Sequence, residues 1–198
     1  MESALEVSRV SSTPVSSLPS PGRAGMFGLI AAESAVFVIF IVAYAFYLGK
    51  SASGPTPSIL KPPLFLSACL LSSSATLELA VHSLKRGAQR AFTGFWVLTL
   101  LLGAIFLAGT ALEWRHLILE EGLTISTNLF GTTFYSLVGL HAVHVTIGLL
   151  LMAAVAFFDA KKQVTPARVP EIGVIALYWH FVDSVWVVVF TLVYLVGR

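Results

Sequence analysis

Hydrophobic residues fall into five long runs along the chain, and shorter segments that contain Gly, Pro and charged residues separate them. A helix that crosses a lipid bilayer needs about 20 mostly apolar residues, and each run reaches that length. The pattern therefore predicts an all-α protein, an integral membrane bundle of five transmembrane helices. The predicted spans are 27–48, 63–84, 92–112, 133–157 and 172–196.

The composition supports a membrane protein. Hydrophobic residues make up 57% of the chain and charged residues 11%, whereas soluble domains carry about 25% charged residues. The formal net charge of +2 gives no reason to expect a nucleic-acid partner. Residues 1–24 are rich in Ser and Pro and lack the run of about 7–15 apolar residues that a signal peptide needs. We expect a disordered tail at 1–24 and one membrane domain at 25–198.

The basic residues are distributed unevenly between the two sides of the membrane. Five spans place the termini on opposite sides, so the tail shares its side with the second and fourth loops. Lys and Arg resist translocation and collect on the cytoplasmic side. The tail side holds eight of them, and the other side holds four, which predicts a cytoplasmic N-terminus and a C-terminus on the outer side. The eight are Arg9, Arg23, Lys85, Arg86, Arg90, Lys161, Lys162 and Arg168, and the four are Lys50, Lys61, Arg115 and Arg198.

Ionisable residues inside the predicted spans are costly there and usually face the bundle interior or another subunit. They are Glu33, Glu78, His82, His141, His144, His180 and Asp183. A helical rise of about 1.5 Å per residue places Glu33 and Glu78 about 9 Å from the inner ends of their spans. On the same rise, His180 and Asp183 lie roughly 12 and 17 Å in, and His144 lies roughly 20 Å in. We therefore expect these side chains mostly in the inner half and the middle of the membrane.

The segment YWHFVDSVW, residues 178–186, places several of these groups on one helix face. Trp179, Asp183 and Trp186 follow the i, i+4, i+7 pattern, and His180 lies one turn from Asp183. His141 and His144 likewise share a face of the fourth span. We hypothesise that Asp183 bonds to His144 or His141 across a helix contact. Small residues in the fourth span would let the two helices approach closely; they are Ser136, Gly139, Ala142 and Gly148.

Each of these groups also has a purely structural interpretation. Glu78 and His82 can pair at i, i+4 or lie at the inner interface, and the other histidines are more often packing groups than metal ligands. Glu33 has no partner within its own helix, so it is the strongest functional candidate. Glu113 and His116 form a Glu-x-x-His pattern, of which di-iron bundles use two copies. Because the sequence has a single copy at a span end, no metal site is predicted.

The residues alone point to three classes of function. A membrane cytochrome would use intramembrane histidines as axial haem ligands, but paired ligands from two helices at matching depths are not evident. A transporter usually shows internal repeats and broken helices, and the span interiors show neither. Short loops and the lack of a nucleotide-binding motif favour the third class, a non-catalytic subunit of a larger membrane complex.

Several motifs, in the same order, resemble subunit III of the haem–copper oxidases, the family that includes cytochrome c oxidase subunit III. YWHFVDSVWVVVFTLVYL resembles the family's closing Trp-His-Phe-Val-Asp segment, and GTTFYSLVGLHAVHVTIG resembles its motif with two histidines. ESAVFVIFIVAYAFYL is similar to the helix that carries the family's intramembrane glutamate, and LAVHSLKRG to its His-Ser-Leu stretch. ALEWRHLILEEGLTIS resembles its Glu-Tyr loop segment. Longer members have two further helices at the start, so this chain resembles the short five-helix bacterial type.

The resemblance implies a role for the chain and for its motif residues. Haems and copper are expected in subunits I and II, and none in this chain. The chain is expected to pack on subunit I, to bind phospholipid, and to support proton uptake and active-site stability. Glu33 and His82 take positions at the lipid or subunit I interface. The remaining motif positions form a structural polar core, His141, His144, Trp179, His180, Asp183 and Trp186, and a loop motif, Glu113 and Trp114.

The complex implied by the resemblance is a respiratory terminal oxidase of the bacterial inner membrane, which reduces O2 to water and pumps protons. Subunit IV is a further candidate partner. The electron donor, cytochrome c or quinol, is expected to bind elsewhere in the complex. There are two alternatives: the equivalent subunit of a quinol oxidase, and the related accessory protein of a nitric oxide reductase.

Overall fold

The computed structural model describes residues 21–51 and 53–197, and every regular element in this part of the chain is helical. The long α-helices are α1 (Pro21–Tyr47), α2 (Leu64–Lys85), α3 (Gln89–Leu119), α4 (Leu129–Ala160) and α5 (Val169–Phe190). Two short 3₁₀-helices, η1 (Pro57–Ile59) and η2 (Pro166–Arg168), lie in the connections, and the π-helix η3 (Thr191–Val196) continues α5. The described residues contain five helices long and apolar enough to cross a membrane, which confirms the predicted fold class.

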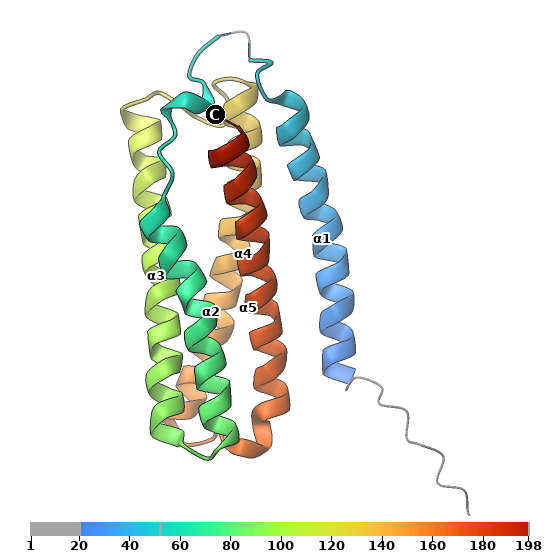
Figure 1. The fold of residues 1–198 in the computed structure, drawn as a ribbon, viewed down its shortest axis with the longest axis vertical. Coiled ribbons are helices and arrows are strands. Elements are labelled where there is room, and N and C mark those ends of the chain that lie inside the picture. Colours follow the sequence, from blue (N-terminus) through green and yellow to red (C-terminus); the bar gives the residue numbers. More distant parts are fainter. Residues whose placement is uncertain (1–20, 52, 198) are drawn as a thin grey trace, which may run out of the picture.

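Helices α2, α3, α4 and α5 form a bundle, and α1 lies outside it against α4 and α5 (Figure 1). Successive helices run in opposite directions. The start of α1, the turn after α2 and the connection between α4 and α5 therefore lie at one end, called the lower end as in Figure 1. The other connections and the end of η3 lie at the upper end. The predicted orientation, with the lower end in the cytoplasm, stays a prediction.

Local sequence explains where the helices begin. α1 begins at Pro21, because proline has the fixed φ of a first helical turn. Residues 21–24 are therefore helical, although the sequence predicted a disordered tail up to residue 24. The rest of that predicted tail, residues 1–20, lies outside the described residues. α4 begins after Asn128, whose side-chain oxygen accepts a hydrogen bond from the Gly131 N–H at 2.8 Å.

Helices α3 and α4 are longer than the spans predicted for them, with 31 and 32 residues. A hydrophobic run marks the part of a helix that lies in lipid, whereas backbone hydrogen bonds continue into the polar residues on either side. Asp159, in the last turn of α4, accepts hydrogen bonds from Gln89 Nε2 and Thr93 Oγ1 of α3, each at 2.5 Å. These bonds join α3 and α4 at the lower end.

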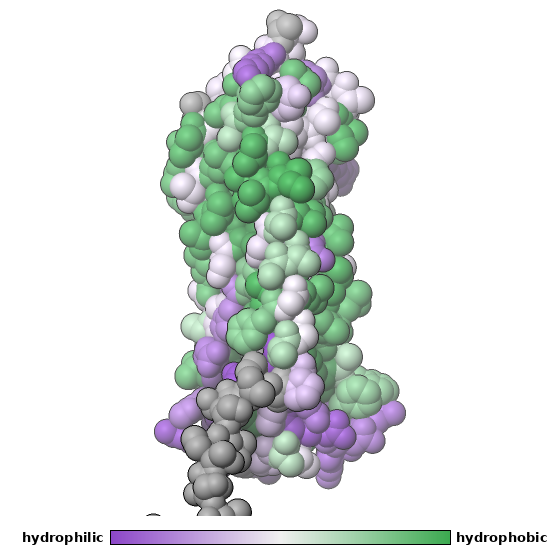
Figure 2. Space-filling view, turned by 90° about the vertical axis from the view of Figure 1, so that its right-hand side faces the viewer, coloured by the Kyte–Doolittle hydropathy of each residue, from purple (hydrophilic) through white to green (hydrophobic). Residues whose placement is uncertain are grey.

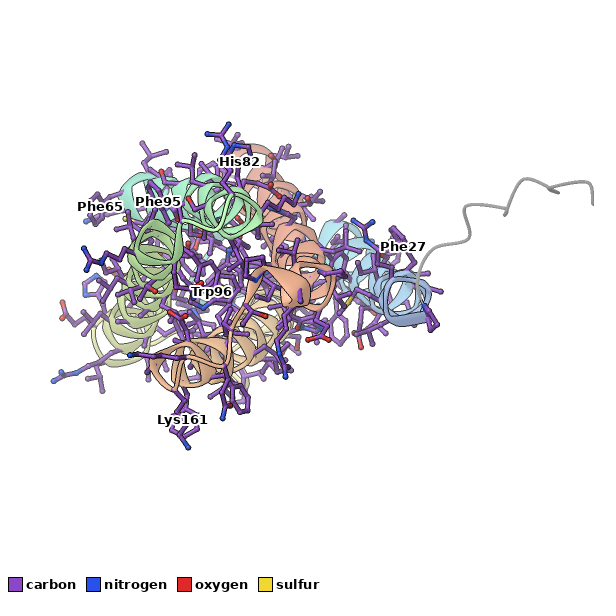
Figure 3. The ribbon with its side chains drawn as sticks, turned by 90° about the horizontal axis from the view of Figure 1, so that it is seen from below. Phe27, Phe65, His82, Phe95, Trp96 and Lys161 are labelled. Carbon is purple, nitrogen blue, oxygen red and sulfur yellow. The ribbon has the colours of Figure 1, made fainter. Side chains whose placement is uncertain are left out.

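The indole of Trp179 packs between α4 and α3 at two glycines. A Cβ atom added to Gly148 would lie 2.6 Å from Trp179 Cε3, and one added to Gly103 would lie 3.0 Å from Trp179 Cη2. These distances are shorter than an ordinary contact of about 3.5–4.0 Å between carbon atoms. Of the four small residues predicted to let α4 and α5 approach closely, Gly148 does so, whereas Gly139 faces Trp114 of α3. Trp96 also points into the centre of the bundle (Figure 3).

The surface of the bundle is apolar along its middle and more polar at its ends. Figure 2, which faces the side of α1, shows hydrophobic residues over most of the middle and hydrophilic residues gathered at the lower end. α1 is the least buried of the five helices. Large apolar side chains such as Ile39 of α1, Leu101 of α3 and Leu150 of α4 are exposed. A lipid environment can cover such a surface.

Candidate functional site

The strongest functional candidate, Glu33, has a partner on another helix. Glu33 Oε2 lies 3.1 Å from His144 Nε2, so α1 and α4 are joined by a polar contact within their spans. The His144 side chain is 8% exposed and that of Glu33 is 30% exposed, so the pair runs from the bundle interior to its surface. Phe37, one turn beyond Glu33, places its ring 4.8 Å from the His144 ring.

The contacts of His144 fix the number of protons on this pair. His144 Nδ1 lies 2.8 Å from the backbone oxygen of Leu140, which only accepts hydrogen bonds, so Nδ1 carries a hydrogen. The bond between Nε2 and Glu33 then needs a further hydrogen, either on the carboxyl group or on Nε2. Two simultaneous hydrogen bonds at the His144 ring therefore require one proton more than an ionised glutamate beside a neutral histidine. Glu33 and His144 are therefore the candidate pair for holding a proton inside the membrane-spanning region.

A second polar cluster connects α2 with α5. Ser74 donates a hydrogen bond to Asp183 Oδ2, and Ser74 Oγ also lies 2.9 Å from His180 Nδ1. His180 Nε2 lies 2.9 Å from Glu78 Oε1. Asp183 is buried, whereas the Glu78 side chain is 62% exposed and the His180 side chain 32% exposed. The cluster therefore reaches from the buried contact between α2 and α5 to the outer surface.

These bonds form an unbroken chain in which each hydrogen has two positions. In one arrangement Ser74 donates to Asp183, His180 Nδ1 donates to Ser74, and a protonated Glu78 donates to His180 Nε2. In the reverse arrangement a protonated Asp183 donates to Ser74, Ser74 donates to Nδ1, and Nε2 donates to ionised Glu78. Shifting all three hydrogens by one bond moves a proton between buried Asp183 and exposed Glu78. The geometry thus permits proton exchange between the interior and the surface.

The structure corrects one predicted pairing and resolves another. Asp183 was expected to bond to His144 or His141, but it accepts from Ser74, because that side of α5 faces α2 rather than α4. For Glu78 the sequence left open a pairing with His82 along its own helix or a place at the inner interface, and the structure instead places it against His180 of α5. His82 lies on the exposed surface of α2, at the outside of the bundle near the lower end (Figure 3).

The two tryptophans of the closing motif bind serines of α2 that the sequence interpretation missed. Trp179 Nε1 donates to Ser73 Oγ at 2.8 Å, and Trp186 Nε1 donates to Ser67 Oγ at 3.1 Å. Both indoles are buried. The available signal was the run of three serines at 72–74, preceded by Ser67, inside an otherwise apolar span. Trp179, Asp183 and Trp186 do share one face, as predicted, and all three contact α2.

His141 occupies a different environment from His144, although the two lie on one helix. Its ring stacks on Trp186 with the centroids 5.0 Å apart, and it meets the edge of Phe106. It is 1% exposed, and neither ring nitrogen has a hydrogen-bond partner among the described residues. The predicted polar core is therefore divided: His141 packs among aromatic rings, His144 pairs with α1, and His180 and Asp183 bind α2.

The loop-motif residues lie near the upper end of α3. Glu113 faces the hydroxyl group of Tyr194 in η3, and the Trp114 ring packs edge-on against Tyr135 at 5.3 Å. His116 contacts Glu120 at 3.0 Å instead of converging with Glu113. Within the described residues, no group of three or more His, Cys, Asp or Glu side chains is arranged to hold a metal ion.

Comparisons with known proteins agree on one family. Residues 23–198 match the family model described as cytochrome c oxidase subunit III. The chain is 40% identical over 179 residues to cytochrome c oxidase subunit 3 of Synechocystis sp. (strain ATCC 27184 / PCC 6803 / Kazusa), covering 86% of this chain and 75% of the relative. It is 34% identical over 176 residues to cytochrome c oxidase subunit 3 of Alkalihalophilus pseudofirmus, covering 87% and 85%. It is also 33% identical over 193 residues to quinol oxidase subunit 3 of Bacillus subtilis (strain 168), covering 94% of each chain.

Proposed function

Because the chain belongs to the cytochrome c oxidase subunit III family, we propose that it is the accessory subunit of a terminal oxidase and carries no redox group of its own. Family membership makes it part of a haem–copper oxidase, of the cytochrome c or quinol type, and a multi-pass protein of a bacterial membrane. We further propose that it packs on subunit I, and that subunits I and II hold the haems and copper with which the complex reduces O2 to water.

The Glu33–His144 pair is the observation that supports our proposal of an accessory role in proton uptake and in active-site stability. It holds a proton within the span, and the 30% exposure of Glu33 brings the carboxyl group to the surface of the bundle. A group placed in this way can exchange a proton with a neighbouring subunit. The pair also links α1 to α4, so its loss is expected to weaken the attachment of α1.

Bound phospholipid is the second part of the proposal. The exposed face of α1 carries large aliphatic side chains, including Val38, Ile39 and Val42. Acyl chains pack on such a surface, and the Glu33–His144 pair holds α1 in place beside α4. Loss of that link is therefore expected to change both the position of α1 and the lipid that stays bound during purification.

Two variants, Glu33→Gln and Glu33→Leu, separate the role of the proton on the Glu33–His144 pair from the role of the contact between α1 and α4. A glutamine amide can donate to His144 Nε2 while Nδ1 still donates to Leu140, so Glu33→Gln preserves the helix contact and removes the proton. Glu33→Leu removes both. We expect both oxidases to assemble. Glu33→Gln should inactivate faster during turnover with its lipid content unchanged, and Glu33→Leu should in addition lose bound phospholipid.

The measurements are phosphorus content per haem and the rate of activity loss during continuous O2 consumption in the purified complex. Ser34→Ala is the matched control, because the Ser34 hydroxyl bonds to Ile30 of its own helix, at 2.6 Å, and to no other helix among the described residues. If both Glu33 variants keep wild-type lipid content and wild-type inactivation kinetics, the role proposed for this pair is wrong.

A cytochrome c oxidase relative and a quinol oxidase relative match this chain over 87% and 94% of its length. Cytochrome c is the proposed donor, and the quinol oxidase relative favours quinol as the alternative. A dinuclear copper motif in the neighbouring subunit II would indicate cytochrome c. The direct test is O2 consumption by the purified complex with reduced cytochrome c and, separately, with quinol: activity with quinol alone would contradict the cytochrome c assignment.

A further inference from the structure

The outer surface between α2 and α5 differs from the rest of the bundle. Its small and polar exposed residues on α2 are Ala75, Glu78 and His82, and on α5 the half-exposed His180 is followed by exposed Ser184. The neighbouring exposed residues Leu71 and Leu79 of α2 and Val187 and Val188 of α5 are apolar. We call the five small and polar residues the α2–α5 polar face. On α2 they follow the spacing i, i+3, i+7, and on α5 the spacing i, i+4, so they form a stripe along the contact of the two helices.

Lipid is a poor environment for this face. Glu78 lies seven residues before the end of α2, which places it about 10 Å from the lower end at a rise of about 1.5 Å per residue. Its side chain is 62% exposed at that depth. Ionisable side chains at membrane depth are costly in hydrocarbon and almost always face protein or a water-filled cavity.

The other outer faces provide the contrast. Along the spans, the exposed large side chains include Val38, Ile39 and Val42 on α1, Leu98, Leu101 and Ile105 on α3, and Val143, Ile147 and Leu150 on α4. These residues suit acyl chains. The distribution of side chains therefore distinguishes the α2–α5 polar face from the faces that lipid can cover.

Glu78 also has unused hydrogen-bonding capacity. One carboxyl oxygen, Oε1, meets His180 Nε2, and Glu78 has no second polar partner among the described residues. A carboxylate can accept several hydrogen bonds, so an incoming donor has room at Glu78. Ala75 of α2, one turn from Glu78, and Ser184 of α5, one turn from His180, are exposed and small. Small residues on a helix surface let a neighbouring backbone approach closely.

We propose that a transmembrane helix of another oxidase subunit docks on the α2–α5 polar face and places a hydrogen-bond donor or a cation beside Glu78. This inference rests on the proposed membership in an oxidase complex and adds the surface through which the complex is held. It also gives a place to His82, which extends the same stripe towards the lower end. The partner helix would present small residues to Ala75 and Ser184.

Photo-crosslinking in the intact oxidase tests the contact. The photoreactive residue p-benzoylphenylalanine replaces Ala75 or Ser184 on the polar face, and Leu101 or Leu150 on the apolar faces as matched controls. Each purified complex is reconstituted in phosphatidylcholine nanodiscs, irradiated, and analysed by mass spectrometry. We expect adducts with another oxidase subunit from positions 75 and 184, at a yield at least fivefold above that from positions 101 and 150.

Three results would overturn the inference. Adducts from positions 75 and 184 that contain mainly phosphatidylcholine would show that lipid covers the face. Adducts with a second copy of this chain would show a homodimer contact instead. Equal yields from the control positions would show that the face is not distinctive. If no haem protein co-purifies with the tagged wild-type chain, the proposed function fails as well, which separates that failure from the other three.

Glu78→Ala provides a second measurement that does not depend on crosslinking chemistry. Removing the carboxylate should lower the fraction of the subunit that stays on the haem-containing complex after a detergent wash, by at least threefold relative to Leu150→Ala. Glu78→Gln, which keeps an acceptor oxygen, should retain more of the subunit than Glu78→Ala. Equal retention of all three variants would contradict the docking contact.

Discussion

Adding one methyl group at Gly148 is predicted to force α4 away from α5. The added Cβ would lie 2.6 Å from Trp179 Cε3 and 2.8 Å from Cζ3, and ordinary carbon contacts are about 3.5–4.0 Å. The indole has little freedom to give way. Its Nε1 donates to Ser73 of α2 at 2.8 Å, and its far edge lies against α3 at Gly103. Relief therefore needs a displacement of about 1 Å between helices that are packed on three sides.

The cost follows from two opposing effects. Overpacking a well-packed core by one methyl group costs about 1–3 kcal/mol, whereas replacing glycine by alanine inside a helix gains about 1 kcal/mol from helix propensity. Gly94 of α3 supplies the control, because a Cβ added there meets nothing within 4 Å. The comparison of Gly148→Ala with Gly94→Ala cancels the propensity gain, so the difference between the two isolates about 1–3 kcal/mol of overpacking.

The assay heats the detergent-solubilised oxidase and measures how much of this subunit is lost from the complex. The temperature at which half of the subunit is lost is taken as the midpoint of unfolding. For a chain of this size a change of 1 kcal/mol shifts the midpoint by about 2–4 °C. Gly148→Ala should therefore unfold about 2–12 °C below Gly94→Ala. If the two variants unfold at the same temperature, Trp179 or its helix moves freely, and the rigid contact inferred from the geometry is wrong.

Three further variants test single buried contacts with the same assay. Ser67→Ala leaves the buried indole N–H of Trp186 without its acceptor, which should cost about 1–3 kcal/mol; a midpoint equal to wild type would show that the bond contributes nothing. Asp159→Ala removes the acceptor of two bonds from α3, including that of Thr93, and should cost about 1.5–3 kcal/mol, since the acceptor is charged. His141→Phe replaces a buried ring that has no hydrogen-bond partner in the described part of the chain, so the midpoint should stay or rise; a fall would indicate that His141 has a polar partner in the complex.

The five spans could be predicted from sequence because a hydrophobic run of the right length has one stable arrangement in a bilayer. The shared face of Trp179, Asp183 and Trp186 also followed from helical periodicity alone. What periodicity does not specify is the neighbour of that face. α5 packs mainly against α1, α2 and α4, and the order of helices around the bundle decides whether Asp183 meets a histidine of α4 or a serine of α2.

The serines of α2 went unrecognised for a related reason. A serine inside a membrane helix often bonds to a backbone oxygen of its own helix, as Ser34 does to Ile30. Sequence does not distinguish such a serine from one that turns to another helix. Ser74 binds both His180 and Asp183, and Ser73 and Ser67 each bind an indole of α5. These contacts became visible only when α2 and α5 were placed side by side.

The polar groups of the bundle form two separate helix contacts. Variants at the two contacts are therefore expected to have different phenotypes. The closing motif binds α2 through Trp179, His180, Asp183 and Trp186, whereas His144 of the preceding motif binds α1 through Glu33. Loss of the Glu33 contact should loosen α1 and change the bound lipid while the α2–α5 polar face stays intact. Loss of Glu78 should weaken attachment to the complex without changing the lipid on α1. In a double variant at Glu33 and Glu78, the changes in the free energy of unfolding should therefore add, because the two sites share no residue and join different helices.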